Sequence, residues 1–222
     1  MRLPLLKATA TLVGLAGLLG LSNIARADSI GPDCTGGSCF GVVYTLQDFL
    51  VDDANHIFNF ILFADTSGYN GGGDAIQAAA FKVTSQSNPG DFDSVTLIDA
   101  PAPVGDWDVH FGGVNANGCQ NNTDGFICSQ NTTTSPAVPD GLLKWVWQVD
   151  YVNAPTFITP SSIKVLYTLD GQQHGITSEN IQLQACDLPE GCTPQKVPEP
   201  GTLALLGALV FGVGYLRVRK ST

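Results

Sequence analysis

Residues 28–197 contain no arginine and only four lysines, whereas they contain 17 aspartates and two glutamates. This segment therefore has a formal net charge of −15, compared with −10 for the whole chain of 222 residues. We do not expect nucleic-acid binding, because contacts to phosphate groups need lysine and arginine. The acidity indicates either solubility through repulsion between like charges or binding of divalent cations.

Local signatures of enzymes are also missing. Neither H-E-x-x-H nor G-x-S-x-G occurs, and the three histidines, His56, His110 and His174, are far apart in the chain. Glycoside hydrolysis needs two carboxylates at a defined separation, and no such pair stands out around Glu179 or Glu190. We therefore expect a protein that is not an enzyme and has no catalytic residues. A secreted hydrolase is the least favoured alternative.

A third absence concerns helices, because residues 28–197 show no long apolar repeat of 3.6 residues with helix caps. Alternation with a period of two dominates instead. In residues 141–152, Leu143, Trp145 and Trp147 face one side, which predicts a half-buried strand with both tryptophans in the core. The other candidate strands are residues 40–50, 57–64, 76–85, 94–99, 107–112, 126–129, 162–169 and 181–185.

Short strands at roughly even spacing, separated by turns rich in Gly, Asn and Pro, are typical of an all-β fold. We expect a single antiparallel β-sandwich, jelly-roll-like, over residues 28–187. One segment, residues 75–81 (AIQAAAF), leaves a helical turn open as an alternative to a strand.

All six cysteines lie between residues 34 and 192, in three close pairs. The short intervals, rich in Gly and Asn, favour three local disulfides among the pairings that six cysteines allow. Export to an oxidising compartment would support such bridges. Zinc is disfavoured, because no pair has the C-x-x-C spacing and no histidine stands beside one. The predicted bridges are Cys34–Cys39, Cys119–Cys128 and Cys186–Cys192.

The first 27 residues have the three parts of a secretory signal peptide. Arg2 and Lys7 form a basic region, an uncharged apolar run follows at residues 8–21, and Ala-Arg-Ala at residues 25–27 fits a cleavage site. We therefore expect export, with cleavage before Asp28.

The C-terminus combines three features in order: Pro198-Glu199-Pro200, an uncharged apolar run at residues 202–216, and the cations Arg217, Arg219 and Lys220. As a helix the run spans roughly 22 Å, which is short for a hydrocarbon core of about 30 Å. By the positive-inside rule, the cations keep this end in the cytoplasm. We expect a transmembrane helix at residues 202–216 and a Pro-rich linker at residues 188–197.

This tail, residues 198–222, resembles the PEP-CTERM sorting signal. The resemblance implies that exosortase, a membrane-bound Cys-dependent transpeptidase, recognises and cuts it. It also implies a transient anchor in the inner membrane of a Gram-negative bacterium that makes exopolysaccharide, followed by delivery to the cell surface or extracellular matrix. The succession WDVHFGG, KWVWQVDY and SIKVLYTLDGQQHG is similar to an uncharacterised β-rich domain common in PEP-CTERM proteins, which supports the architecture alone.

Two weak patterns suggest ligands for the β domain. We expect no cofactor other than calcium, which prefers oxygen ligands such as Asp side chains. Trp107 lies at a predicted strand near Gly-rich turns and is the candidate for stacking on a sugar ring. Solvated turns explain the acidic residues at least as well. The candidate calcium ligands are Asp91, Asp93, Asp99, Asp106 and Asp108.

The sequence thus predicts a non-enzymatic secreted or cell-surface protein that exosortase sorts. Its own role would be structural or adhesive within exopolysaccharide or a biofilm matrix. The alternative is a carbohydrate- or calcium-binding β-sandwich module. The expected partners are exosortase, the inner membrane and exopolysaccharide.

Overall fold

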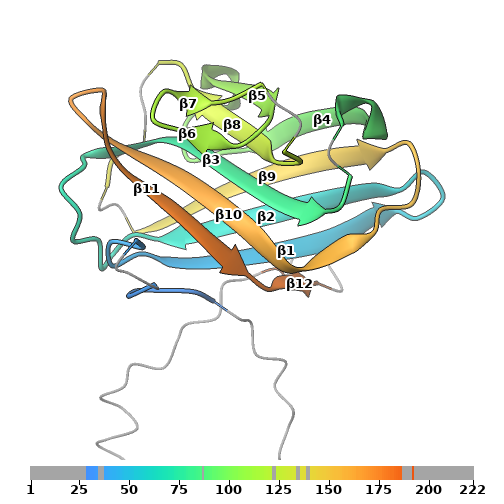
Figure 1. The fold of residues 1–222 in the computed structure, drawn as a ribbon, viewed down its shortest axis with the longest axis horizontal. Helices are drawn as coiled ribbons and strands as arrows, with labels where there is room; N and C mark the ends of the chain where they lie inside the picture. The colour runs from blue at the N-terminus through green and yellow to red at the C-terminus, as the bar shows by residue number, and fades with distance from the viewer. Residues whose placement is uncertain are drawn as a thin grey trace, which may run out of the picture.

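The computed structural model describes residues 29–34, 38–86, 88–121, 124–133, 136–138, 141–186 and 192, which form a β-sandwich of two five-stranded sheets (Figure 1). Sheet A has the spatial order β12 (Leu183–Ala185), β1 (Val43–Asp52), β2 (Ile57–Asp65), β9 (Leu142–Tyr151) and β4 (Phe92–Asp99). Sheet B has the order β11 (Gln172–Ile181), β10 (Phe157–Leu169), β3 (Ala75–Thr84), β8 (Ile127–Asn131) and β5 (Trp107–Phe111). Neighbouring strands are antiparallel except β1 and β12, which pair in parallel.

The core lies between the two sheets. Trp145, Trp147 and Val149 alternate along β9 and are completely buried, together with Phe81 of β3 and Tyr167 of β10. The rings of Phe81 and Trp147 approach to 4.9 Å between centroids across the sandwich. The prediction that the period-two pattern of residues 141–152 buries both tryptophans is confirmed.

A small hairpin covers part of the outer face of sheet B. It consists of β6 (Val114–Asn115) and β7 (Gly118–Cys119), and Val114 packs with Ala78 and Ala80 of β3. Because β3 is therefore buried on both faces, residues 75–81 form an apolar run without alternation. The strand interpretation of this segment is confirmed, and the helical-turn alternative is wrong.

The all-β architecture with antiparallel sheets is confirmed. Strands β1 and β2 form a hairpin within sheet A, and β10 and β11 form a hairpin within sheet B. In these two hairpins the turns at residues 53–56 and 170–171 are short enough that each strand pairs with its neighbour in the chain. From β2 to β5 and from β8 to β10, successive strands instead alternate between the two sheets, and the pairs β3–β10, β4–β9 and β5–β8 are nested, as in a jelly roll.

Three disulfides staple the domain, and all three predicted pairs are confirmed. Cys34–Cys39, Cys119–Cys128 and Cys186–Cys192 have Cα–Cα distances of 5.2, 5.8 and 5.5 Å. Each closes a loop of fewer than ten residues, so each constrains the chain locally. On the loop-entropy model, such a bridge stabilises the fold by about 2–3 kcal/mol.

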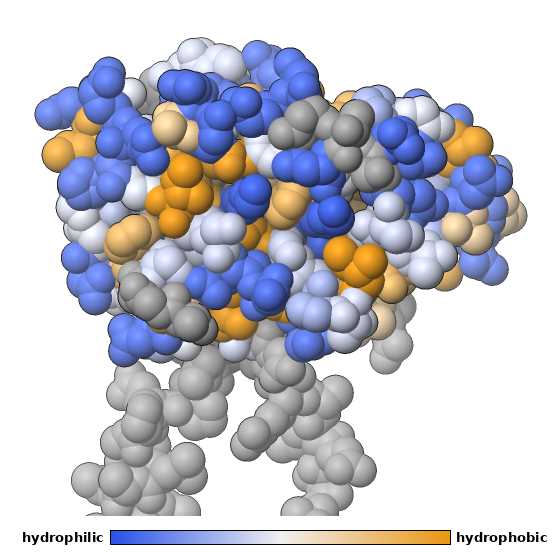
Figure 2. Space-filling view, in the orientation of Figure 1, coloured by the Kyte–Doolittle hydropathy of each residue, from blue (hydrophilic) through white to orange (hydrophobic). Residues whose placement is uncertain are grey.

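The face of the sandwich that carries β10 and β11 is mostly polar. Apolar side chains appear on it only in small patches separated by polar ones (Figure 2). Broad apolar patches mark interaction surfaces, and this face of the sandwich shows no broad apolar patch.

Several predictions concern segments outside the described residues. These are the signal peptide at residues 1–27, the greater part of the linker at residues 188–197, and the tail at residues 198–222 with its transmembrane helix. Within the described part of the chain, no helix has the length and apolar character needed to cross a membrane.

Candidate functional site

The place where the chain leaves the sandwich toward its C-terminus is defined by β12 and the last disulfide. β12 adds to the edge of sheet A by pairing with Leu46, Gln47 and Asp48 of β1. The amide of Cys186 then donates a hydrogen bond to the carbonyl oxygen of Asp48, at 2.8 Å. Backbone pairing therefore holds the chain to β1 up to Cys186.

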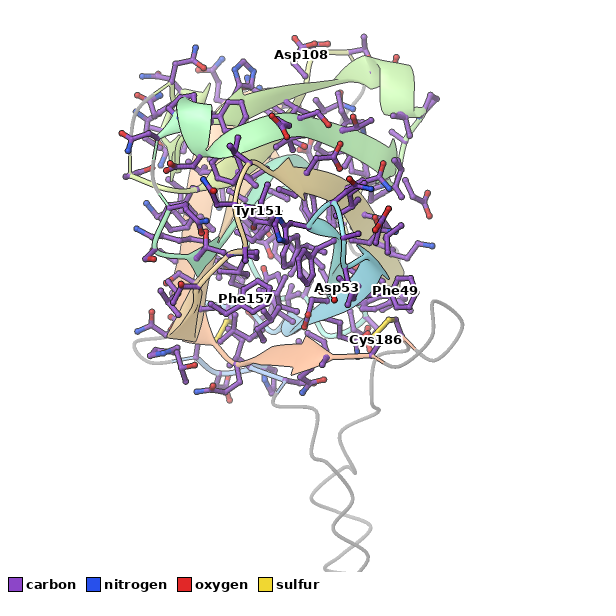
Figure 3. All side chains as sticks on the ribbon, turned by 90° about the vertical axis from the view of Figure 1, so that its right-hand side faces the viewer. Phe49, Asp53, Asp108, Tyr151, Phe157 and Cys186 are labelled. Carbon is purple, nitrogen blue, oxygen red and sulfur yellow. A yellow bond between two sulfur atoms is a disulfide. The ribbon has the colours of Figure 1, made fainter. Side chains whose placement is uncertain are left out.

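Cys192 docks on the outer face of sheet A. It is 7 % exposed and packs with Ile61 and Phe63 of β2 and Val146 of β9, while Phe49 and Cys186 flank this cluster. Figure 3 shows Phe49 beside the disulfide of Cys186. The apolar side chains on this outer face explain why Cys192 is buried there, since apolar area removed from water contributes about 25 cal/mol per Å².

The N-terminal end of the described chain lies against the same strand. Ile30 and Tyr44 form an antiparallel bridge with two backbone hydrogen bonds, of 3.0 and 2.8 Å. The hydroxyls of Ser29 and Thr45 are 2.8 Å apart. Both ends of the domain thus pack along β1 at one edge of sheet A (Figure 1).

A polar network connects the first disulfide loop to the core beside β1. The Tyr44 hydroxyl hydrogen-bonds to the Tyr167 hydroxyl and lies 3.2 Å from Thr177 Oγ1, which donates to the carbonyl oxygen of Ser38 at 2.8 Å. Burial raises the pKa of Tyr44 and Tyr167 far above the usual range, so both stay protonated. The network therefore anchors the loop that contains Ser38 and has no group poised for acid–base chemistry at neutral pH.

The five aspartates proposed as calcium ligands lie on the opposite edge of the sandwich, where β4 and β5 are the edge strands. Asp91 ends the short helix η2 (Pro89–Asp91), Asp93 and Asp99 belong to β4, Asp106 ends η3 (Val104–Asp106), and Asp108 belongs to β5. Asp99 forms an ion pair with Lys144, at 2.5 Å.

Among the described residues, these aspartates form no group of three whose ligand atoms lie within 4.8 Å of one another. The one such group comprises Cys34, Cys39 and Glu179. Its two sulfurs are joined in a disulfide, so they cannot act as thiolate ligands. Calcium binding stays a prediction to which this geometry adds nothing.

Trp107 was the candidate for stacking on a sugar, and the structure corrects this interpretation. Its side chain is only 5 % exposed, and its ring packs edge-on against Trp145 with centroids 5.9 Å apart. The alternation along β5 turns Trp107 toward sheet A, where it fills the core. A ring buried in this way offers no face to a ligand.

The three histidines take local roles. Nδ1 of His110 lies 3.2 Å from the side-chain oxygen of Asn121. His174 lies against Gly72, where an added Cβ would be only 2.2 Å from its Nε2. His56 adopts a positive φ of 53° in the turn between β1 and β2.

The family comparison concerns the segment that follows Cys192. Residues 196–220 match the model of the PEP-CTERM protein-sorting motif. The chain carries a PEP-CTERM sorting motif. This motif is the substrate signal of exosortase, so the PEP-CTERM tail directs the exported chain to membrane-associated sorting toward the cell surface.

Comparisons of the whole chain with known proteins are less informative about its function. No curated protein matches its sequence. Among solved structures, the collagen-binding subdomain of the Enterococcus faecalis surface protein ACE is 13 % identical over 65 % of this chain and 96 % of its own, with a TM-score of 0.33. A collagen-binding domain from a Staphylococcus aureus adhesin is 11 % identical over 63 % and 96 %, with a TM-score of 0.26.

A GH20 exo-β-N-acetylglucosaminidase from Vibrio harveyi is 12 % identical over 69 % of this chain, with a TM-score of 0.28. The alignment covers 19 % of that enzyme. TM-scores this low assign no ligand or activity to the PEP-CTERM protein.

The docking of Cys192 was missed by sequence reasoning. A signal for it existed in β2, where Ile61 and Phe63 occupy the positions that an exposed face would fill with polar residues. A strand that is apolar on both faces indicates that something covers its outer side. Cys192, held by its disulfide to Cys186, covers the outer side of β2.

Proposed function

We propose that this protein is a non-enzymatic component of an exopolysaccharide or biofilm matrix that exosortase delivers to the cell surface. The observation that carries the proposal is the PEP-CTERM motif at residues 196–220, which follows a disulfide-stapled β-sandwich. The signal peptide at residues 1–27 exports the chain. Residues 202–216 then hold it in the inner membrane, with Arg217, Arg219 and Lys220 on the cytoplasmic side.

The sandwich suits an extracellular structural or adhesive role. Its three disulfides each remove conformational freedom from the unfolded chain, which favours persistence outside the cell. Its large negative charge keeps copies apart in solution and leaves their association to other matrix components.

The sorting step is tested by replacing Pro198-Glu199-Pro200 with three alanines in cells that contain exosortase. We expect uncut, membrane-bound precursor, because the motif is what the enzyme recognises. The matched control replaces Thr193-Pro194-Gln195, which directly precede the motif, with three alanines and should be processed normally. Release of the triple variant at the rate of the native chain would contradict exosortase sorting.

The matrix role is tested by deleting the gene and measuring the mass and cohesion of the biofilm. We expect weaker cohesion, restored by the native chain but not by the variant with three alanines at residues 198–200. Glycan-array binding of the processed protein, with and without EDTA, addresses the alternative of a carbohydrate- or calcium-binding module. Tight binding that EDTA abolishes would favour that module over a structural component.

A further inference from the structure

The position of Cys192 limits how the domain can stand relative to the enzyme that cuts the tail. Cys192 lies on the outer face of sheet A, over β2 and β9, which are the third and fourth strands of that sheet. Its disulfide to Cys186 and its burial against Ile61, Phe63 and Val146 fix this point. The chain after Cys192 must therefore reach the enzyme from the outer face of sheet A.

The tether between that point and the motif is short. Pro198 follows Cys192 by six residues, and a fully extended chain spans at most about 3.6 Å per residue, or about 22 Å in all. Pro194 lies within this tether and reduces its freedom further.

The path from Cys192 to the other side of the sandwich is longer than this tether. Passing over β9 and β4 to the nearer edge takes about 10 Å, at about 4.8 Å per strand. Crossing two sheets that pack about 10 Å apart, with a side-chain layer on each outer face, adds about 20 Å. The total of about 30 Å exceeds the tether of about 22 Å.

We infer that the outer face of sheet A is the surface that faces exosortase while the enzyme holds Pro198. The outer face of sheet B, which carries the β6–β7 hairpin, then points away from the enzyme. The inference rests on the proposed sorting function and adds an orientation to it.

Two exposed positions, one on the outer face of each sheet, can carry a probe for contact with the enzyme. Thr96 on β4 pairs with Gln148 and follows Val95, which packs on the core, so Thr96 points out from sheet A. Ser178 on β11 pairs with Lys164 and follows the buried Thr177, so Ser178 points out from sheet B. A photo-crosslinking amino acid is placed at one position or the other in the full chain.

The experiment uses cells whose exosortase is catalytically inactive, so that the uncut precursor accumulates on it. We expect enzyme crosslinks from position 96 to exceed those from position 178 by about fivefold or more, since a tether that cannot span the path gives almost no encounter. Equal crosslinking, stronger crosslinking from position 178, or none from either would overturn the inference. Failure of the native precursor to accumulate would contradict the sorting function itself.

Variants of the tether complete the test. Eight Gly and Ser residues inserted after Cys192 lengthen the tether to about 50 Å, so the ratio of crosslinks should fall toward one. Replacing Cys186 and Cys192 with serine should lower the ratio in the same direction, because the tether then starts at β12. The matched control replaces Cys34 and Cys39 with serine and should keep the ratio of the native chain. An unchanged ratio after the insertion would also overturn the inference.

Discussion

Replacing Trp147 with phenylalanine isolates a hydrogen bond that joins the two sheets. Trp147 lies on β9 of sheet A and is completely buried. Its Nε1 donates to Oγ of Ser129, on β8 of sheet B, at 2.6 Å, and Ser129 is also completely buried. The substitution removes the donor and leaves the Ser129 hydroxyl without this partner in a place that water does not reach.

The expected loss has two parts, and Trp145 provides the control for one of them. Trp145 is equally buried on the same face of β9, but its Nε1 has no hydrogen-bond partner among the described residues. Trp145→Phe therefore removes volume, for about 1–2 kcal/mol, but no hydrogen bond, and the loss of a buried donor without a partner offsets part of this cost. Trp147→Phe removes similar volume and also strands a buried hydroxyl, which costs about 1–3 kcal/mol more.

The assay is guanidinium-induced unfolding of the processed protein with its disulfides intact, which gives the free energy of unfolding for each variant. We expect Trp147→Phe to be less stable than Trp145→Phe. Adding Ser129→Ala to Trp147→Phe should recover part of the difference, because both polar partners are then absent. Equal losses for the two tryptophans, or a double variant whose effects are strictly additive, would refute the role of this hydrogen bond.

Two further predictions concern buried groups elsewhere in the domain. Burial raises the pKa of Asp48, which is 9 % exposed, so the folded state binds this proton more tightly than the unfolded chain. The buried, ionised carboxylate of Asp48 lowers the stability of the folded state. This penalty is absent below the ordinary carboxyl pKa, grows as the pH rises through the raised pKa, and is complete above the raised pKa. Asp48→Asn should therefore stabilise the protein at neutral pH but not in acid, and a thermal-unfolding series that shows equal effects at both would contradict this. Replacing Cys119 and Cys128 with serine should lower the free energy of unfolding by about 2–3 kcal/mol, and denaturant titrations that match the native chain would contradict the role of this bridge.

The strands that alternate were predictable from sequence because most of their buried apolar side chains lie on one face. β9 and β10 have a clear period of two, and the structure places strands at both segments. β3 was ambiguous, since the β6–β7 hairpin covers its second face and removes the polar positions that would have marked the period. The local pairing of the cysteines was predictable because short loops favour closure.

Features that depend on non-local contacts could not be read in the same way. Trp107 resembles an exposed ligand platform until β5 is placed opposite β9, where Trp145 covers its ring. The parallel pairing of β12 with β1 joins residues more than 130 positions apart, and no local pattern encodes it. The five aspartates come to one edge only because β4 and β5 end the two sheets on the same side.

The central claim, that the tail is a sorting signal which exosortase removes, is tested most directly by the intact mass of the native product from the cell surface. We predict a C-terminus at or near Pro198-Glu199-Pro200, with the Cys186–Cys192 bridge retained in the same peptide. A mass that still includes Arg217, Arg219 and Lys220 would contradict the account.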